Sequence, residues 1–220
     1  DRRRVGTHEF EVGVDQIDAL TLHSRPALGD DERGGHAQLL LQQRDYPVYL
    51  RSPLADIAVF DSYDGAQYSC SPRAVYEELA RRNTDLECVW VTQDGQFPID
   101  CTTDVNTRTV LAGSREHYRV LARARHIVTN RGLPPWYFKR DGQTYVQTWH
   151  GTPLKRLAHD LRDMPYQRTE RNDWLDWEVA RWDLLLSPSP YATQIMRRAF
   201  HYDGDVLETG YPRNDILSSP

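Results

Sequence analysis

Short apolar runs alternate with amphipathic stretches along the chain from residue 56 onward. The apolar runs predict strands at residues 56–60, 86–91, 126–129, 145–149, 183–186 and 205–208. The stretches between them predict helices at residues 72–82, 114–124, 170–180 and 190–200, and a further helix that begins at Pro153. This alternation predicts an α/β fold, in which a Rossmann-like parallel sheet carries helices on both faces.

Three of the predicted helices begin with a Ser-Pro or Thr-Pro pair. In these pairs Ser71, Thr152 and Ser189 are the expected N-caps, and the proline that follows takes the first helical position. In parallel sheets, ligands bind outside the carboxyl ends of the strands, where such helix starts point. We therefore expect the functional site at this edge of the sheet.

The pattern before residue 53 is different. Alternating residues at 9–14 and 46–50 predict short strands, and a polar, glycine-rich stretch at residues 29–35 separates them. We expect residues 1–52 to be a β-rich remnant of a preceding module, and residues 53–220 to form the Rossmann-like domain. The ends of the chain suggest a piece of a longer polypeptide.

Composition removes several classes of protein. The chain has 220 residues, of which 39% are hydrophobic and 27% charged, as in soluble globular proteins. No apolar run approaches the roughly 18 residues of a membrane-spanning helix. The net charge of −5 does not favour a nucleic-acid partner. Three cysteines without CxxC spacing predict neither a zinc site nor a disulfide framework, and they fit a reducing compartment.

The common nucleotide and hydrolase motifs are absent. The chain has no Walker A sequence, no GxGxxG after the first predicted strand, no GxSxG and no HExxH. The histidines other than His150 lack metal-ligand spacing. The sequence also has no cluster of carboxylates that would indicate a dedicated metal site. These absences count against ATPases, dehydrogenases with the usual fingerprint, α/β-hydrolases and zincins.

The main candidate for chemistry lies in residues 147–155, where a predicted strand runs into His150. Imidazole titrates near pH ~6.5 and can take a proton from an attacking hydroxyl at neutral pH. Gly151 permits close approach, and free N–H groups at the expected helix start at Thr152 would attract an anion, with Lys155 one turn on. This combination suits phosphoryl or glycosyl transfer. The alternative is that His150 only holds a tight turn together.

Two further loops follow predicted strands. Asn130 and Arg131 come directly after residues 126–129, and Arg131 could bind phosphate or carboxylate. The alternative is a structural turn with Arg131 in solvent. Arg213, in residues 210–215, could also bind an anion, although such turns are often only structural. Residues 61–64, directly after the first predicted strand, are a candidate of the same strength as the Arg213 segment.

Taken together, residues 147–155, 129–131, 210–215 and 187–200 resemble the CDP-glycerol glycerophosphotransferase family, the teichoic acid primases and polymerases of Gram-positive bacteria. The resemblance covers about residues 56–217. It implies a GT-B architecture and transfer of glycerol phosphate, or another polyol phosphate, from a CDP-linked donor to a hydroxyl of a wall polymer, releasing CMP. The family's proposed catalytic base maps onto His150. Asn130, Arg131, Gly151, Thr152, Lys155 and Arg213 are then the expected substrate contacts.

The resemblance also implies partners and a location. These are a CDP-glycerol-type donor, a lipid-linked polymer acceptor, and peripheral attachment to the cytoplasmic face of a bacterial membrane. No cofactor is identified, and a need for divalent metal is left open. Residues 53–220 would be the acceptor-side domain with the second GT-B domain missing, so we expect the fragment alone to be inactive. The alternatives are a GT-B glycosyltransferase that uses a nucleotide sugar and a non-enzymatic α/β binding module.

Overall fold

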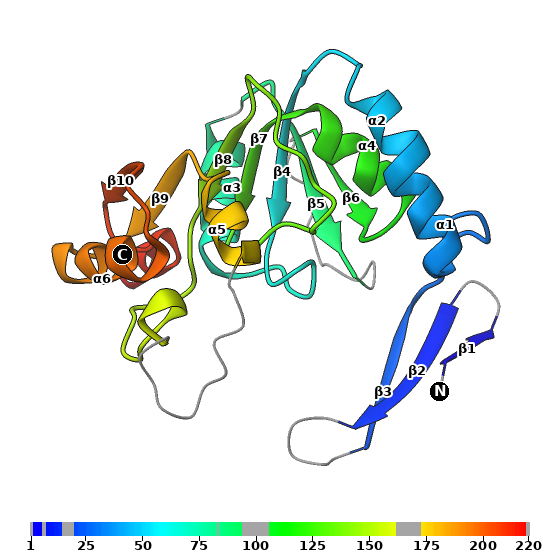
Figure 1. Ribbon diagram of the computed structural model, residues 1–220, viewed down its shortest axis with the longest axis horizontal. Helices are drawn as coiled ribbons and strands as arrows, with labels where there is room; N and C mark the ends of the chain where they lie inside the picture. Colours follow the sequence, from blue (N-terminus) through cyan, green and yellow to red (C-terminus); the bar gives the residue numbers. More distant parts are fainter. Residues whose placement is uncertain are drawn as a thin grey trace.

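The computed structural model describes residues 2–5, 8–14, 20–82, 84–93, 106–161 and 173–218. Near the N-terminus, three antiparallel strands form a small sheet that extends away from the rest of the molecule (Figure 1). They are β1 (Arg2–Val5), β2 (His8–Val14) and β3 (Leu20–Pro26), and β2 confirms the strand predicted at residues 9–14. Among the described residues, no helix has the length and apolar character needed to span a membrane.

Seven parallel strands form the main sheet, in the order β10-β9-β8-β7-β4-β5-β6. The chain begins in the middle at β4, moves outward to β6, and returns to the other side of β4 at β7. This is the doubly wound Rossmann order, so the predicted fold class is confirmed. The strands are β4 (Ala55–Asp61), β5 (Glu87–Thr92), β6 (Thr107–Leu111), β7 (Ala124–Thr129), β8 (Thr144–Gln147), β9 (Leu184–Ser187) and β10 (Asp205–Glu208).

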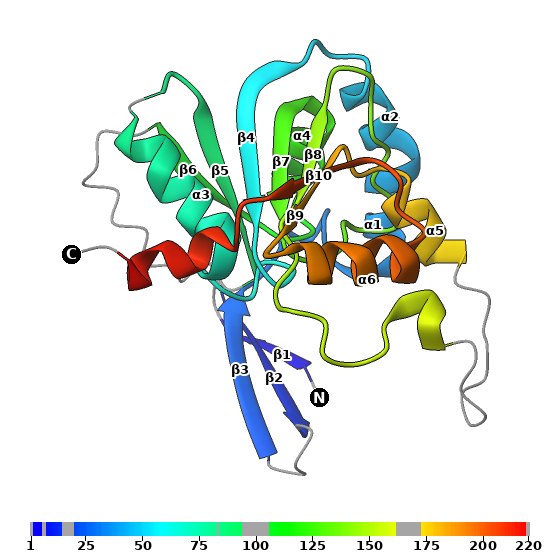
Figure 2. The same ribbon diagram turned by 90° about the vertical axis from the view of Figure 1, so that its left-hand side faces the viewer.

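Helices cover both faces of this sheet (Figures 1 and 2). Successive strand residues point to opposite faces, so Val59 joins the larger core with α4 (Arg115–Arg123), α5 (Asp173–Val179) and α6 (Pro190–Phe200). Phe60 packs into the smaller core beneath α3 (Cys70–Arg81). Right-handed crossovers place α3 on one face and α4, α5 and α6 on the other, because the chain reverses its direction across the sheet between β6 and β7.

Of the four predicted helices whose starts lie among the described residues, two form where expected, and of the three predicted N-caps only Ser189 is confirmed. Ser114 and Ser189 cap α4 and α6, where their hydroxyls accept the N–H groups of His117 (3.2 Å) and Ala192 (3.3 Å). In contrast, α3 begins two residues earlier than predicted, with Ser69 as its N-cap, and Ser71 lies buried inside the helix. The fourth prediction, a helix at Pro153, is wrong.

Residues 148–157 contain no helix, and only a short 3-10 turn, η2 (Ala158–Leu161), follows them. The strand ends at Gln147, earlier than predicted, and local bonds hold the next residues outside a helix. The Thr148 N–H donates to the Thr129 carbonyl (2.8 Å), and the Trp149 N–H donates to Gln147 Oε1 (2.8 Å). Trp149 also has a φ of 53°, which no right-handed helix allows.

Residues 46–50 were predicted as a strand, and this is also wrong. They continue a helical stretch made of α1 (Gly34–Leu40), a π-helical turn η1 (Leu41–Asp45) and α2 (Tyr46–Tyr49). Leu41 and Tyr46 are buried in the core of the main sheet, and the Tyr46 ring packs edge-on against Trp136 at 5.2 Å. Tertiary packing has therefore overridden the strand preference of these aromatic and β-branched residues.

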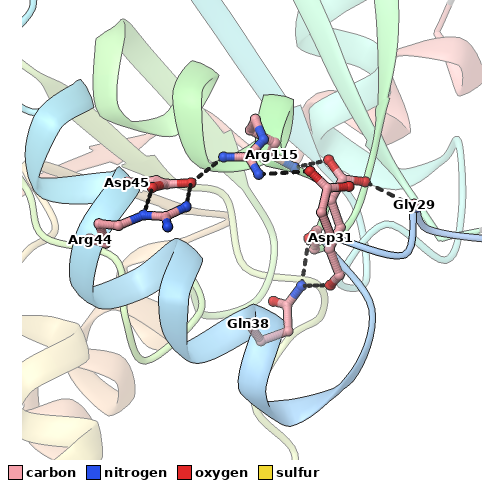
Figure 3. Close-up of polar contacts among 8 residues, drawn as sticks. Gly29, Asp31, Gln38, Arg44, Asp45 and Arg115 are labelled. Atoms are coloured by element: carbon pink, nitrogen blue, oxygen red, sulfur yellow. Dashed lines mark hydrogen bonds and ion pairs between the residues drawn. The ribbon is translucent and has the colours of Figure 1, made fainter.

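Polar contacts attach this helical stretch to the start of α4 (Figure 3). Arg115 pairs with Asp45 and with Asp31 Oδ2 (2.9 Å), and its backbone N–H donates to Glu32 Oε1 (2.7 Å). Gln38 Nε2 donates to the Gly113 carbonyl (2.8 Å). The predicted helix from residue 170 begins at Asp173 in the described part of the chain, and residues 170–172 lie outside it. The domain boundary at residue 52 stays a prediction.

Candidate functional site

The crevice between β4 and β7 is the point where the sheet changes direction, which is where open α/β sheets bind ligands. Asn130 lies directly after β7 and is fully buried. Its Oδ1 accepts the Tyr63 N–H (2.8 Å), and its Nδ2 donates to the Ser62 hydroxyl (3.3 Å). Asn130 therefore ties together the two loops that border the crevice.

His150 reaches the same edge of the sheet from β8, the neighbour of β7. Its half-buried ring stacks on Trp149, with centroids 4.5 Å apart, and lies 5.9 Å from the Tyr63 ring. Among the described residues, neither ring nitrogen has a hydrogen-bond partner. Contacts with neighbouring aromatic rings thus hold the imidazole in place, and its nitrogens are available to a substrate.

Burial lowers the pKa of His150, and the positive charges of Arg131 and Arg213 lower it further. A lowered pKa means that the ring is neutral at physiological pH. A neutral imidazole can accept a proton, so His150 has the protonation state that a general base needs.

Arg213 connects the predicted segment at residues 210–215 to the one at residues 147–155. It lies in η3 (Pro212–Leu217), and its Nη1 donates to the His150 carbonyl (2.9 Å). The same nitrogen lies 3.5 Å from Cys70 Sγ. Arg213 therefore fixes the backbone of His150 and keeps a positive charge beside its ring.

Cys70 is the residue at this site that the sequence reasoning missed. Its Sγ lies 3.8 Å from the Tyr63 hydroxyl. Burial works to raise the pKa of the thiol, but hydrogen bonds from Asn130, the Ser71 N–H, Tyr63 and Arg213 outweigh it, and the pKa is lowered. The available signal was its place at the start of the helix after β4, which was predicted two residues too late.

Backbone strain concentrates around His150. Six described residues other than glycine have positive φ, and four of them border this crevice. They are Tyr63, Asp64, Cys70 and Trp149. Such conformations cost on the order of 1–3 kcal/mol each and cluster where the surrounding structure enforces a functional geometry. This concentration independently marks the crevice as the candidate site.

Of the other predicted contacts, Arg131 lies where it was expected, whereas Gly151, Thr152 and Lys155 do not form the expected helix start. Arg131 is at the crevice, where it forms an ion pair with Asp64 (3.1 Å). Thr152 and Lys155 are exposed in a loop, and a Cβ atom on Gly151 would meet open space. Because no helix begins here, the expected anion site at a helix N-terminus does not form. Arg131 and Arg213 supply the positive charge near His150 instead.

A cluster that sequence spacing did not predict brings together His159 of η2, Asp176 of α5 and His201 at the end of α6. His159 Nε2 is 2.6 Å from Asp176 Oδ1, and the His159 and His201 rings stack with centroids 4.0 Å apart and planes within 2°. The three groups lie close enough for metal ligands. However, one ion cannot lie in the planes of both parallel rings, so this arrangement is a stacked pair rather than a formed metal site.

Comparison with known proteins places these features in a family. The family model described as CDP-Glycerol:Poly(glycerophosphate) glycerophosphotransferase matches residues 46–220. A teichoic acid poly(glycerol phosphate) polymerase of Bacillus spizizenii is 40% identical over 167 residues, which cover 73% of this chain and 42% of that protein. A teichoic acid glycerol-phosphate transferase of Staphylococcus aureus is 38% identical over 177 residues, covering 79% and 45%.

Solved structures agree with this match. A variant of the wall teichoic acid polymerase TagF superposes with a TM-score of 0.71 and 34% identity, covering 82% of this chain and 46% of that one. A TagF variant soaked with CDPG gives a TM-score of 0.71 and 31% identity, covering 84% and 50%. The chain spans less than half the length of the curated relatives it matches. Sequence and fold together show that the chain belongs to the CDP-glycerol:poly(glycerophosphate) glycerophosphotransferase family.

Proposed function

We propose that this chain contributes the acceptor side of an active site that transfers glycerol phosphate, or another polyol phosphate, from a CDP-linked donor to a hydroxyl of a teichoic-acid-type polymer. His150 is the general base. The observation that carries the proposal is the half-buried imidazole of His150, whose ring nitrogens have no hydrogen-bond partner in the described part of the chain and whose pKa is lowered by burial and by two nearby arginines, where the sheet changes direction. Membership of the family supports the same reaction.

The reaction accounts for each of these groups. The acceptor oxygen attacks the phosphorus that carries the glycerol and forms a new O–P bond. The bond from that phosphorus to the bridging oxygen breaks, and CMP leaves with the electron pair. His150 takes the proton of the attacking hydroxyl, while Arg131 and Arg213 offset negative charge on the phosphates. Positioning and electrostatics of this kind dominate phosphoryl transfer.

The remaining predicted contacts keep supporting roles in the proposal. Asn130 positions the loops that border the crevice. Gly151, Thr152 and Lys155 contact substrate phosphate from an exposed loop, and the side chain of Lys155 supplies a third positive charge.

The wider setting belongs to the same proposal. The chain is the acceptor-side Rossmann-like half of a GT-B enzyme, which works on a lipid-linked polymer while attached peripherally to the cytoplasmic face of the membrane. A CDP-linked donor is supported by the TagF variant soaked with CDPG. A teichoic-acid-type acceptor is supported by the relatives, which are named as teichoic acid transferases or polymerases.

Replacing His150 tests the proposal. In the full-length protein, His150→Ala should lower the rate of CMP release from CDP-glycerol in the presence of acceptor by about 10²–10⁴-fold, because the attacking hydroxyl loses its base. Unchanged thermal unfolding would show that the fold survives. His36→Ala, which removes an exposed histidine on α1, is the matched control and should keep normal turnover. Near-normal turnover by His150→Ala would refute the assignment.

The same assay separates the alternatives. A nucleotide-sugar transferase would turn over UDP-linked sugars and leave CDP-glycerol unused. A non-enzymatic module would turn over neither, and calorimetric titration would detect no binding of donor or acceptor.

A further inference from the structure

A cavity of about 480 Å³ opens beside the His150 crevice, at the carboxyl ends of the strands on the face covered by α4 and α5. Its size lies in the range of pockets that hold small ligands. Its polar and aromatic wall is formed by Asp61, Asp64, His117, Arg131, Trp136 and Trp174. Arg131 belongs both to this wall and to the surroundings of His150, so the two sites are adjacent.

Two tryptophans provide apolar surface. Trp136 is fixed in place, because its ring stacks on Tyr118 with centroids 3.9 Å apart. Trp174 is half exposed on α5 and lies directly over Gly132, where a Cβ atom would come within 3.1 Å of its ring. A glycine at position 132 thus allows this indole to close over the loop after β7.

His117 lines the inner wall of the cavity as a neutral ring. The ring is 3% exposed, and its Nδ1 accepts the Gly113 N–H (3.1 Å), which puts the ring hydrogen on Nε2. Burial lowers the pKa of His117 to about 4, so the ring is neutral at physiological pH. Nε2 is enclosed and has no hydrogen-bond partner among the described residues. The ring packs edge-on against Trp136, with ring centroids 5.5 Å apart, and so helps to fix that indole in the wall.

Asp61 supplies the complementary group. It is 4% exposed, and one carboxyl oxygen accepts the Gly65 N–H (2.8 Å). Burial raises its pKa to about 7, so it exchanges between a hydrogen-bond acceptor and a donor near neutral pH. Arg131 and Asp64, which also line the wall, form an ion pair with each other (3.1 Å).

These groups decide the chemistry of the ligand. A phosphate would lie beside the carboxyl groups of Asp61 and Asp64, and a purely apolar ligand would leave the carboxyl group of Asp61 facing no polar group. A hydroxyl can donate to Asp61 or, when that carboxyl group is protonated, accept from it, and the C–H groups between hydroxyls can pack on the indoles. We propose that this cavity binds a neutral polyhydroxylated group, either a sugar ring or a glycerol unit, of the acceptor polymer; the link to the acceptor rests on the proposed function.

Ligand-observed NMR with two neutral probes tests the binding itself. Methyl glucoside and glycerol represent the two possible sources, and at least one should bind the full-length protein with a Kd in the millimolar range. Trp174→Ala should weaken that binding at least tenfold, since it removes the exposed indole. Trp177→Ala removes a neighbouring α5 indole that packs on Arg181 and does not line the cavity, so it should leave binding unchanged.

The outcomes separate this inference from the proposed function. Binding of methyl glucoside alone assigns a sugar ring, and binding of glycerol assigns a polyol unit. If neither probe binds, or if Trp174→Ala binds as tightly as the wild type, the inference is wrong. His150→Ala should bind the probes normally while losing turnover. If the wild type binds the probes but does not turn over CDP-glycerol, the proposed function and its acceptor assignment are wrong. The cavity is then still a site for polyhydroxylated ligands.

Discussion

The charge around one imidazole decides whether it can act as a base. Burial, Arg131 and Arg213 all lower the pKa of His150, so protonation of the ring is confined to acidic solution. Arg213 is also tied to the His150 carbonyl, so replacing it would move the backbone. Arg131 has no such bond to His150 and is therefore the cleaner residue for testing the electrostatic effect.

Arg131→Gln should raise the pKa of His150, because a nearby positive charge is removed and the carboxylate of Asp64 loses its partner. The acidic limb of the pH profile of kcat/KM should move to higher pH, so that activity at pH 6 falls more than activity at pH 8. Arg44→Gln, at an exposed arginine that pairs with Asp45, should leave the limb in place. A limb that moves to lower pH in Arg131→Gln would contradict the electrostatic argument.

Helix starts show how far local sequence determines an element. The Ser-Pro pair at Ser189 forms the predicted cap, whereas Ser71 lies inside α3 and its hydroxyl has no hydrogen-bond partner in the described structure. The same dipeptide thus has two structural roles, and the difference comes from where the preceding loop allows the helix to begin.

Ser189→Ala should lower the free energy of unfolding by about 1 kcal/mol, because the Ala192 N–H loses its acceptor. Ser71→Ala removes a hydroxyl that has no hydrogen-bond partner among the described residues, and it should change stability by less than about 0.5 kcal/mol. Urea unfolding of both variants measures the difference. Equal losses would mean that the two serines act alike, against the structure.

Strand positions were largely predictable, because a strand buried on both faces appears in the sequence as a short apolar run. β6 was missed because Thr107 and Thr109 interrupt its apolar residues. The helix at Pro153 failed for a different reason, since bonds from Thr148 and Trp149 to groups of β7 and β8 hold the chain away from helical geometry. Those bonds exist only once the sheet has formed.

The site was predictable in part for the same reason. His150, Asn130, Arg131 and Arg213 each follow a predicted strand, so their common edge could be inferred from the parallel sheet. Their partners could not be inferred. Cys70 meets Arg213 only through the packing of η3 against α3, and His117 meets Trp136 through the packing of α4 against the loop after β7.

At the scale of the whole molecule, the helical stretch at residues 34–49 and the main sheet share one core. Tyr46 is 3% exposed and contacts aromatic residues of α4 and of the loop after β7. The two parts should therefore unfold together, although the predicted boundary at residue 52 separates them.

Tyr46→Ala should destabilise the whole Rossmann-like unit by about 3–5 kcal/mol, as expected for removing a large buried aromatic side chain. Unfolding followed by tryptophan fluorescence and by far-UV circular dichroism should give one shared transition at lower denaturant. Val48→Ala, at a side chain that is 56% exposed, should have little effect. A separate early transition that leaves the sheet at wild-type stability would instead support a domain boundary at residue 52.

The hydrogen bond from Arg213 to the His150 carbonyl spans 63 positions of sequence. All seven strands of the parallel sheet precede η3, so a protein shortened to residue 211 would retain every one of them. It would nevertheless lose the guanidinium that holds the backbone of His150, and with it one of the charges that lowers the pKa of the ring. A correctly formed sheet is consequently not enough to give His150 the surroundings that the proposed base needs, because the short turn η3 supplies part of them.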